Sequence, residues 1–193
     1  HQYYGGQEKG TAAFLAQSMD MGRYIQTVCN ICDVAGVQRR SKKKINICFD
    51  EWGVWEIPNT EVQESVENAP WQIAPAISEQ IYTLEDALLF AGMQMAMLRN
   101  ADVIRIACQS LLTNISACIM TQENGDMWLQ TIYYPFFYLS NYARGVVLQD
   151  VCQSDCYECE DFPEVPYLDV LTVWNQEQHY IAIFAINKSE DEK

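Results

Sequence analysis

The chain has 193 residues, 49% of them hydrophobic and 12% aromatic, so it can fill a core and is not a disordered sequence. Its formal net charge of −14 argues against a basic surface, which nucleic acids and anionic membranes select in their protein partners. No apolar run approaches the roughly 20 residues of a membrane span. We therefore expect neither a nucleic acid nor a membrane as partner.

The first part of the chain alternates predicted helices and strands. Apolar residues recur on one face from Thr11 onward, which predicts a helix that Thr11 can cap. The short apolar run 45–49 then predicts a strand buried on both faces. Residues 56–82 hold three prolines and little periodicity, so we expect a long loop there.

The middle of the chain continues this alternation. Residues 82–100 predict a helix that begins with a capping box of Thr83 and Asp86, and its wide apolar face predicts burial on more than one side. Residues 101–109 predict another buried strand. Residues 125–145 predict an aromatic helix that Pro135 kinks or begins.

Beyond residue 146 the sequence changes to strands separated by turns, with no predicted helix between them. The preceding order of helix and strand in turn is typical of a parallel sheet or barrel. We therefore place a domain boundary near Gly145, with an α/β domain at 1–145 and the start of an all-β domain at 146–193.

The eight cysteines favour free thiols over disulfides. Cys48, for example, lies inside a predicted strand, and a free cysteine behaves as a small buried hydrophobe. Such usage fits a reducing compartment. Cys152, Cys156 and Cys159 are close enough in sequence to begin a zinc site, but a fourth ligand at matching spacing is missing. Incidental loop thiols are the favoured reading, and a metal site is the alternative.

The acid pair Asp50–Glu51 is the best candidate for chemistry. Ligands of βα folds bind where the strands end, which is where the pair lies. If Glu51 faces the mouth of a barrel, Asp50 points away and acts as a brace, while Trp52 and Trp55 line an aromatic wall suited to a sugar ring. The alternative, which spacing alone slightly favours, is that the pair caps a helix and the tryptophans are core residues.

Other familiar catalytic motifs are absent from the sequence. It has no glycine-rich phosphate loop, no Gly-x-Ser-x-Gly elbow and no His-Glu-x-x-His. His1 and Tyr3 are two residues apart and face the same side if the chain is extended there. A lone histidine is more often an ordinary hydrogen-bonded residue than a catalyst, so we assign His1 a supporting role.

Several collinear segments resemble glycoside hydrolase family 51, the α-L-arabinofuranosidases. The segment "INICFDEWGVW" resembles the family's "DEWNVWY" region, and "HQYYGG" resembles its His-x-Tyr loop. Further resemblances to family blocks, in the same order, are found in "IYTLEDALLFAGMQMAMLRNADVIRIAC", "NISACIMT", "WLQTIYYPF" and "YLDVLTVWN…FAINKS". Together these blocks span nearly the whole chain.

The resemblance implies an α/β fold class: the last strands and helices of a (β/α)8 TIM barrel, followed by the first strands of a β-sandwich. It implies a retaining glycosidase without metal or organic cofactor, in which Glu51 is the nucleophile. The family's acid/base residue, in an Asn-Glu pair on an earlier strand, has no counterpart in this chain. The partners would be arabinan or arabinoxylan oligosaccharides, and the full-length protein would be a homo-oligomer. We expect the protein in the cytoplasm, with secretion left open.

The same resemblance implies substrate-binding residues. Tyr3 matches a tyrosine near the sugar and the nucleophile, and Trp55 matches a pocket tryptophan. The family's sugar-contacting Gln falls at Leu111, so the contact is either moved to Gln109 or lost. Gly53 replaces an Asn.

These departures leave two alternatives open. One is a paralogue that binds arabino-oligosaccharides without cleaving them. The other is a related retaining barrel glycosidase that acts on xylosides or glucosides.

Overall fold

The structure, a computed structural model, describes residues 1–56, 64, 67–68, 71, 73 and 78–191. Most of the predicted loop 56–82 therefore lies outside the described residues. The elements in chain order are β1 (Gln2–Tyr4), η1 (Gln7–Lys9), α1 (Thr11–Gln38), β2 (Ile47–Val54), α3 (Leu84–Arg99), β3 (Ile104–Gln109), β4 (Ile119–Thr121), β5 (Met127–Leu129), α4 (Tyr133–Tyr142), β6 (Val146–Val147), β7 (Cys156–Cys159), β8 (Phe162–Pro166), β9 (Leu168–Asn175) and β10 (Tyr180–Asn187).

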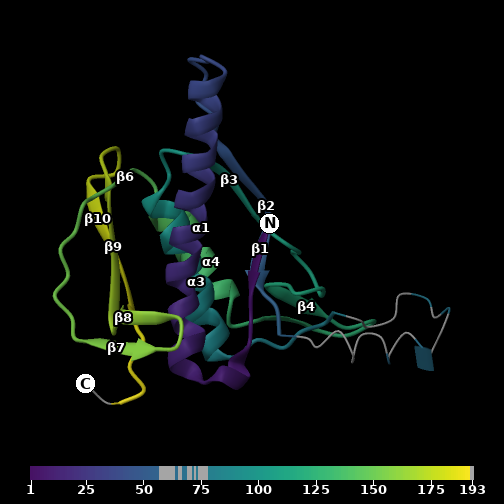
Figure 1. The fold of residues 1–193 in the computed structure, drawn as a ribbon. Helices are drawn as coiled ribbons and strands as arrows, with labels where there is room; N and C mark the ends of the chain where they lie inside the picture. The colour runs from purple at the N-terminus through teal and green to yellow at the C-terminus, as the bar shows by residue number, and fades with distance from the viewer. Residues whose placement is uncertain (57–63, 65–66, 69–70, 72, 74–77, 192–193) are drawn as a thin grey trace.

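The described elements form layers on either side of a group of helices (Figure 1). A parallel sheet with the order β1-β2-β3 lies on one side, and an antiparallel sheet with the order β10-β9-β6 lies on the other. The helices α1, α3 and α4 lie between them. The mixture of parallel strands with helices, followed by antiparallel strands, agrees with the predicted α/β class.

Strand β2 is longer than the sequence predicts. It does not end at Asp50–Glu51 but continues through Gly53 to Val54. Phe49 pairs with Ala107 and Trp52 with Gln109, so two residues of β2 oppose one residue of β3. Such a bulge bends a strand and re-aims its side chains. It allows Phe49 and Trp52, which are three residues apart, both to be buried.

Strand β3 is much less buried than predicted. Ile104 is buried, but the side chains of the next four residues are exposed, and Ile106 is 53% exposed. In the described part of the chain β3 pairs with β2 alone. A groove between β3, α3 and α4 is lined in part by Ile106 and Ala107. An apolar run of this kind is buried only when both faces of its strand are covered by other elements, and the described residues do not cover both faces of β3.

Helix α3 agrees closely with the predicted helix at residues 82–100. The Thr83 hydroxyl accepts from the Asp86 main-chain N–H, and the Asp86 carboxylate accepts from the Thr83 N–H, which completes the capping box. Phe90 packs in the core cluster with Trp52, whereas Met95 packs with Leu171 of the antiparallel sheet. The helix is thus buried on more than one side.

Two details of the predicted helices are wrong, namely the cap of the first helix and the start of the aromatic helix. Helix α1 begins at Thr11 as expected, but Gly10 is its N-cap, and the Thr11 hydroxyl donates to Glu85 instead. The aromatic helix is limited to α4, because Met127–Leu129 pairs with β4 as strand β5. Pro135 lies in the first turn of α4, where its missing N–H removes no helical hydrogen bond.

The hairpin β7–β8 was not predicted. Cys156 and Cys159 lie in β7 rather than in a loop, and Phe162 and Val165 of β8 pack on Ala16 of α1. All eight cysteines are free thiols. Among the residues described, no group of three or more His, Cys, Asp or Glu side chains is placed to hold a metal ion.

A search of the described helices finds none with the length and apolar character needed to cross a membrane. The boundary at Gly145 stays a prediction.

Candidate active site

Glu51 lies in the bulged part of β2, near the carboxyl end of the strand, and its side chain is partly buried. Parallel strands bring their carboxyl ends to one edge of the sheet, so Ser110, the first residue after β3, is within reach. The Ser110 hydroxyl donates to Glu51 Oε1 at 3.0 Å. This bond joins the ends of two neighbouring strands.

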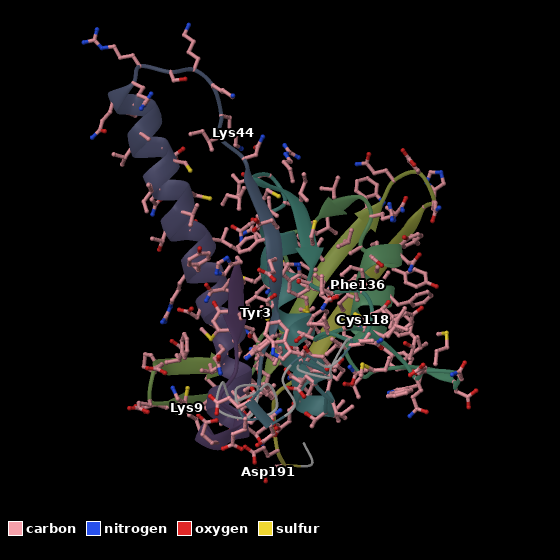
Figure 2. All side chains as sticks on the ribbon, turned by 90° about the vertical axis from the view of Figure 1, so that its right-hand side faces the viewer. Tyr3, Lys9, Lys44, Cys118, Phe136 and Asp191 are labelled. Carbon is pink, nitrogen blue, oxygen red and sulfur yellow. The ribbon has the colours of Figure 1, made fainter. Side chains whose placement is uncertain are left out.

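Tyr3 brings a second hydroxyl to the same carboxylate. It lies on β1 and pairs with Gly53 of β2, among the parallel strands (Figure 2). Its hydroxyl lies close to the Ser110 and Glu51 side chains. Burial, aided by the hydrogen bond and negative charge of Glu51 and opposed by Ser110, raises the pKa of Tyr3 to about 12. The phenol is therefore protonated at neutral pH and can donate to a carboxylate.

The two tryptophans occupy different environments. Trp55 is partly buried and meets the Tyr3 ring edge to face, with 6.2 Å between the ring centroids and 78° between the planes. Trp52 is 1% exposed and lies 4.6 Å from the Phe90 ring, between the sheet and α3. The expected aromatic wall of both tryptophans is thus corrected: Trp55 and Tyr3 lie at the site, and Trp52 is a core residue, because the bulge aims it at the helix.

His1 and Asp50 lie beside each other at the surface. The His1 main-chain nitrogen is 3.7 Å from Asp50 Oδ1, and their side chains are 72% and 79% exposed. The exposure of the Asp50 side chain fits the expectation that Asp50 and Glu51 point to opposite sides of the strand, with Glu51 directed toward Ser110.

Gln109 has its amide engaged within the chain. Its Nε2 donates to the Ser116 carbonyl at 2.8 Å, and its Oε1 accepts from the Cys118 thiol at 3.7 Å. Leu111, where the family resemblance places the sugar-contacting Gln, is 47% exposed. A sugar contact by Gln109 would have to compete with these two bonds.

Ser110 is the residue that sequence reasoning missed. A signal was present, since Ser110 follows directly on a predicted strand, at the edge where polar side chains meet in βα folds. The sequence does not reveal, however, that the hydroxyl turns toward Glu51, because that depends on the bulge in β2 and on the path of the chain after β3.

Glu56 is a second missed residue. Its Oε2 accepts from the main-chain N–H groups of Gly6 and Gln7 at 3.2 and 3.4 Å, which ties the loop after β1 to the end of β2. Burial raises the pKa of Glu56, and these two hydrogen bonds oppose the rise. The Gln7 side chain continues the connection to Asp86 at 2.9 Å, at the start of α3.

Taken together, the site is a carboxylate that accepts a hydrogen bond from Ser110 and lies close to the hydroxyl of Tyr3, whose ring packs against Trp55. Such a carboxylate can attack an electrophilic carbon or accept from a sugar hydroxyl. Among the described residues, the hydrogen bond that orients the Glu51 carboxylate comes from Ser110.

Comparison with known proteins places this chain in a family. Residues 50–192 match the family of the α-L-arabinofuranosidase C-terminal domain. Over 192 residues the chain is 45% identical to an intracellular exo-α-(1→5)-L-arabinofuranosidase of Halalkalibacterium halodurans and 43% identical to intracellular exo-α-(1→5)-L-arabinofuranosidase 1 of Bacillus subtilis. Each match covers 100% of this chain and 38% of the relative.

A solved structure agrees with this assignment. The chain superimposes on a family 51 α-L-arabinofuranosidase of Bifidobacterium longum with a TM-score of 0.91 and 30% sequence identity, over 100% of this chain and 40% of that one. The resemblance seen in the sequence is confirmed: the chain belongs to the α-L-arabinofuranosidases of glycoside hydrolase family 51.

Proposed function

We propose that this chain is part of a longer, retaining exo-α-L-arabinofuranosidase in which Glu51 is the nucleophile. The observation that carries the proposal is the Glu51 carboxylate near the carboxyl end of β2, which accepts a hydrogen bond from Ser110 and lies close to the Tyr3 hydroxyl. The family membership of the chain and the names of its relatives support the activity. The chain spans 38% of the length of those relatives, so the activity belongs to the longer polypeptide.

In this mechanism the Glu51 carboxylate attacks the anomeric carbon of a terminal arabinofuranosyl unit. The bond to the leaving oxygen breaks as a second carboxylic acid, outside this chain, gives that oxygen its proton. Retaining enzymes hold the two carboxyls about 5 to 5.5 Å apart. Water, deprotonated by the second carboxylate, then hydrolyses the glycosyl ester, which releases arabinose of unchanged configuration and restores Glu51. No metal or organic cofactor takes part.

We also propose that residues 1–145 are the last part of a (β/α)8 barrel and that residues 146–193 begin a β-sandwich. The parallel order β1-β2-β3, with α1 and α3 between successive strands, supports the first assignment. The separate antiparallel sheet of β6, β9 and β10 supports the second. Among the described strands β3 pairs with β2 alone, which fits a sheet that continues beyond β3 in the longer polypeptide.

The substrate class follows from the relatives. The two relatives described above are both named for the α-(1→5) linkage, so we propose terminal α-(1→5)-L-arabinofuranosyl units of arabinan-type oligosaccharides. The word "intracellular" in those names supports a cytoplasmic location. A homo-oligomer of the full-length protein stays a prediction.

The experiment that tests this function replaces Glu51 with Ala in the full-length protein. Turnover of an aryl α-L-arabinofuranoside should fall by several orders of magnitude, because the nucleophile is lost. External azide should restore part of the rate and give the inverted glycosyl azide. Glu158→Ala, at an exposed glutamate in β7, is the matched control and should turn over like wild type. Binding of arabino-oligosaccharides without hydrolysis by the wild type would instead show a non-catalytic paralogue.

A further inference from the structure

Ser110 has a fixed position in front of the carboxylate. It begins the loop after β3, which several hydrogen bonds hold in shape. Gln109 Nε2 donates to the Ser116 carbonyl at 2.8 Å, and the Leu111 and Asn114 N–H groups donate to the carbonyls of Ile115 and Ile119 at 3.3 and 2.8 Å. The Ser110 hydroxyl therefore does not need to be ordered when substrate binds.

The direction of the hydrogen bonds follows from their chemistry. An ionised carboxylate only accepts, so the single Ser110 proton goes to Glu51 Oε1. Tyr3, which is protonated, can donate to Glu51 directly or to the Ser110 oxygen. Either way, Ser110 is the hydroxyl whose proton is committed to the carboxylate.

We propose that Ser110 is a positioning residue that stabilises Glu51 as the departing carboxylate when the glycosyl-enzyme is hydrolysed. This inference rests on the function proposed for Glu51. A hydrogen bond to a charged acceptor is roughly twice as strong as one to a neutral acceptor. The Ser110 bond is therefore worth more when Glu51 is a free carboxylate than when it is a neutral ester.

The consequence is specific to one step. Without the Ser110 hydroxyl, the ester is favoured relative to the free carboxylate, so the second step slows and the first does not. With an aryl arabinofuranoside that has a good leaving group, the covalent intermediate then accumulates. Accumulation lowers kcat and KM together and leaves kcat/KM nearly unchanged, a pattern that a general structural disturbance does not give.

The test compares Ser110→Ala, Ser110→Thr and wild type in the full-length protein. For Ser110→Ala we expect kcat and KM to fall together by about tenfold, the difference between a charged and a neutral hydrogen bond. Ser110→Thr retains the hydroxyl and should restore both constants. Intact-protein mass spectrometry during turnover should show more arabinosyl-enzyme in Ser110→Ala than in wild type.

The matched control is Ser140→Ala, because the Ser140 hydroxyl bonds within α4, to the Phe137 carbonyl, and that serine is exposed. Wild-type constants in Ser110→Ala would overturn the inference. So would an equal loss of kcat and kcat/KM, or failure of Ser110→Thr to restore them. These results are distinct from failure of the proposed function, which would appear as undiminished turnover in Glu51→Ala.

Discussion

At the residue scale, the two tryptophans next to the acid pair illustrate how one bulge separates two roles. Trp52 and Trp55 are three residues apart in one short segment, and both are large aromatic side chains. The bulge at Asp50–Glu51 turns Trp52 toward Phe90 in the core and leaves Trp55 against Tyr3 at the site. The two residues should therefore respond differently to the same substitution.

Trp55→Ala should raise KM for an arabinofuranoside by roughly two- to tenfold, because a lost aromatic contact is worth roughly 0.5–1.5 kcal/mol. It should lower the melting temperature much less than Trp52→Ala does, because Trp55 is only partly buried. Trp52→Ala should instead lower the free energy of unfolding by about 3–5 kcal/mol, the usual cost of emptying a buried aromatic site. Steady-state kinetics and thermal unfolding of both variants test this pair. Equal effects on KM would contradict the separation of roles.

At the element scale, Glu56 connects the end of β2 to the loop after β1. Burial raises its pKa, so the folded protein holds the proton more tightly than the unfolded chain does. By linkage, the wild type loses stability as the pH rises from the ordinary glutamate range through this raised value. Below that range Glu56 is protonated in both the folded and the unfolded protein, so it no longer lowers the stability.

Glu56→Gln removes the titration but retains a carbonyl oxygen for the Gly6 and Gln7 N–H groups. Relative to wild type, the variant should therefore be more stable at pH 7 than at pH 4. Melting temperatures of the two proteins across this pH range give the measurement. A difference that does not change with pH would show that Glu56 is not buried in its charged form. Glu158→Gln, an exposed matched change, should show no such trend.

The elements also show what sequence could and could not predict. Helix α3 was predicted well, because its capping box and apolar face are local signals that tertiary contacts only reinforce. The β7–β8 hairpin was missed, since its strands are short and depend on contacts of Phe162 and Val165 with Ala16 of α1. The sequence predicts Glu51 at the end of a strand, and the structure has it three residues before the end of β2, whereas its bond to Ser110 depends on a bulge that has no sequence signature.

At the scale of the whole molecule, a buried lysine connects the antiparallel sheet to the helical layer. Lys188 follows β10 and is 4% exposed, and its ammonium group donates to the Ser18 hydroxyl of α1 at 3.1 Å. It also lies 3.8 Å from Asp169 Oδ2 of β9. Burial lowers the pKa of Lys188, and the nearby Asp169 opposes this shift. The antiparallel sheet is thus anchored to the first helix of the chain by a polar contact as well as by apolar packing.

Lys188→Met should lower the free energy of unfolding by about 1–3 kcal/mol, because Ser18 and Asp169 lose a buried partner. Chemical denaturation followed by tryptophan fluorescence gives the value. Lys43→Met, at an exposed lysine, should stay within about 0.5 kcal/mol of wild type. Equal stability of Lys188→Met and wild type would mean that apolar packing alone holds the two layers together.

The central claim is that one carboxylate, that of Glu51, forms the bond to the sugar. The most direct test treats the full-length protein with a cyclophellitol-type or fluorinated arabinofuranose probe and locates the adduct by peptide mass mapping. We predict a single adduct on Glu51, which forms more slowly when arabinose is present. A stable adduct on any other side chain, with Glu51 unmodified, would contradict the account.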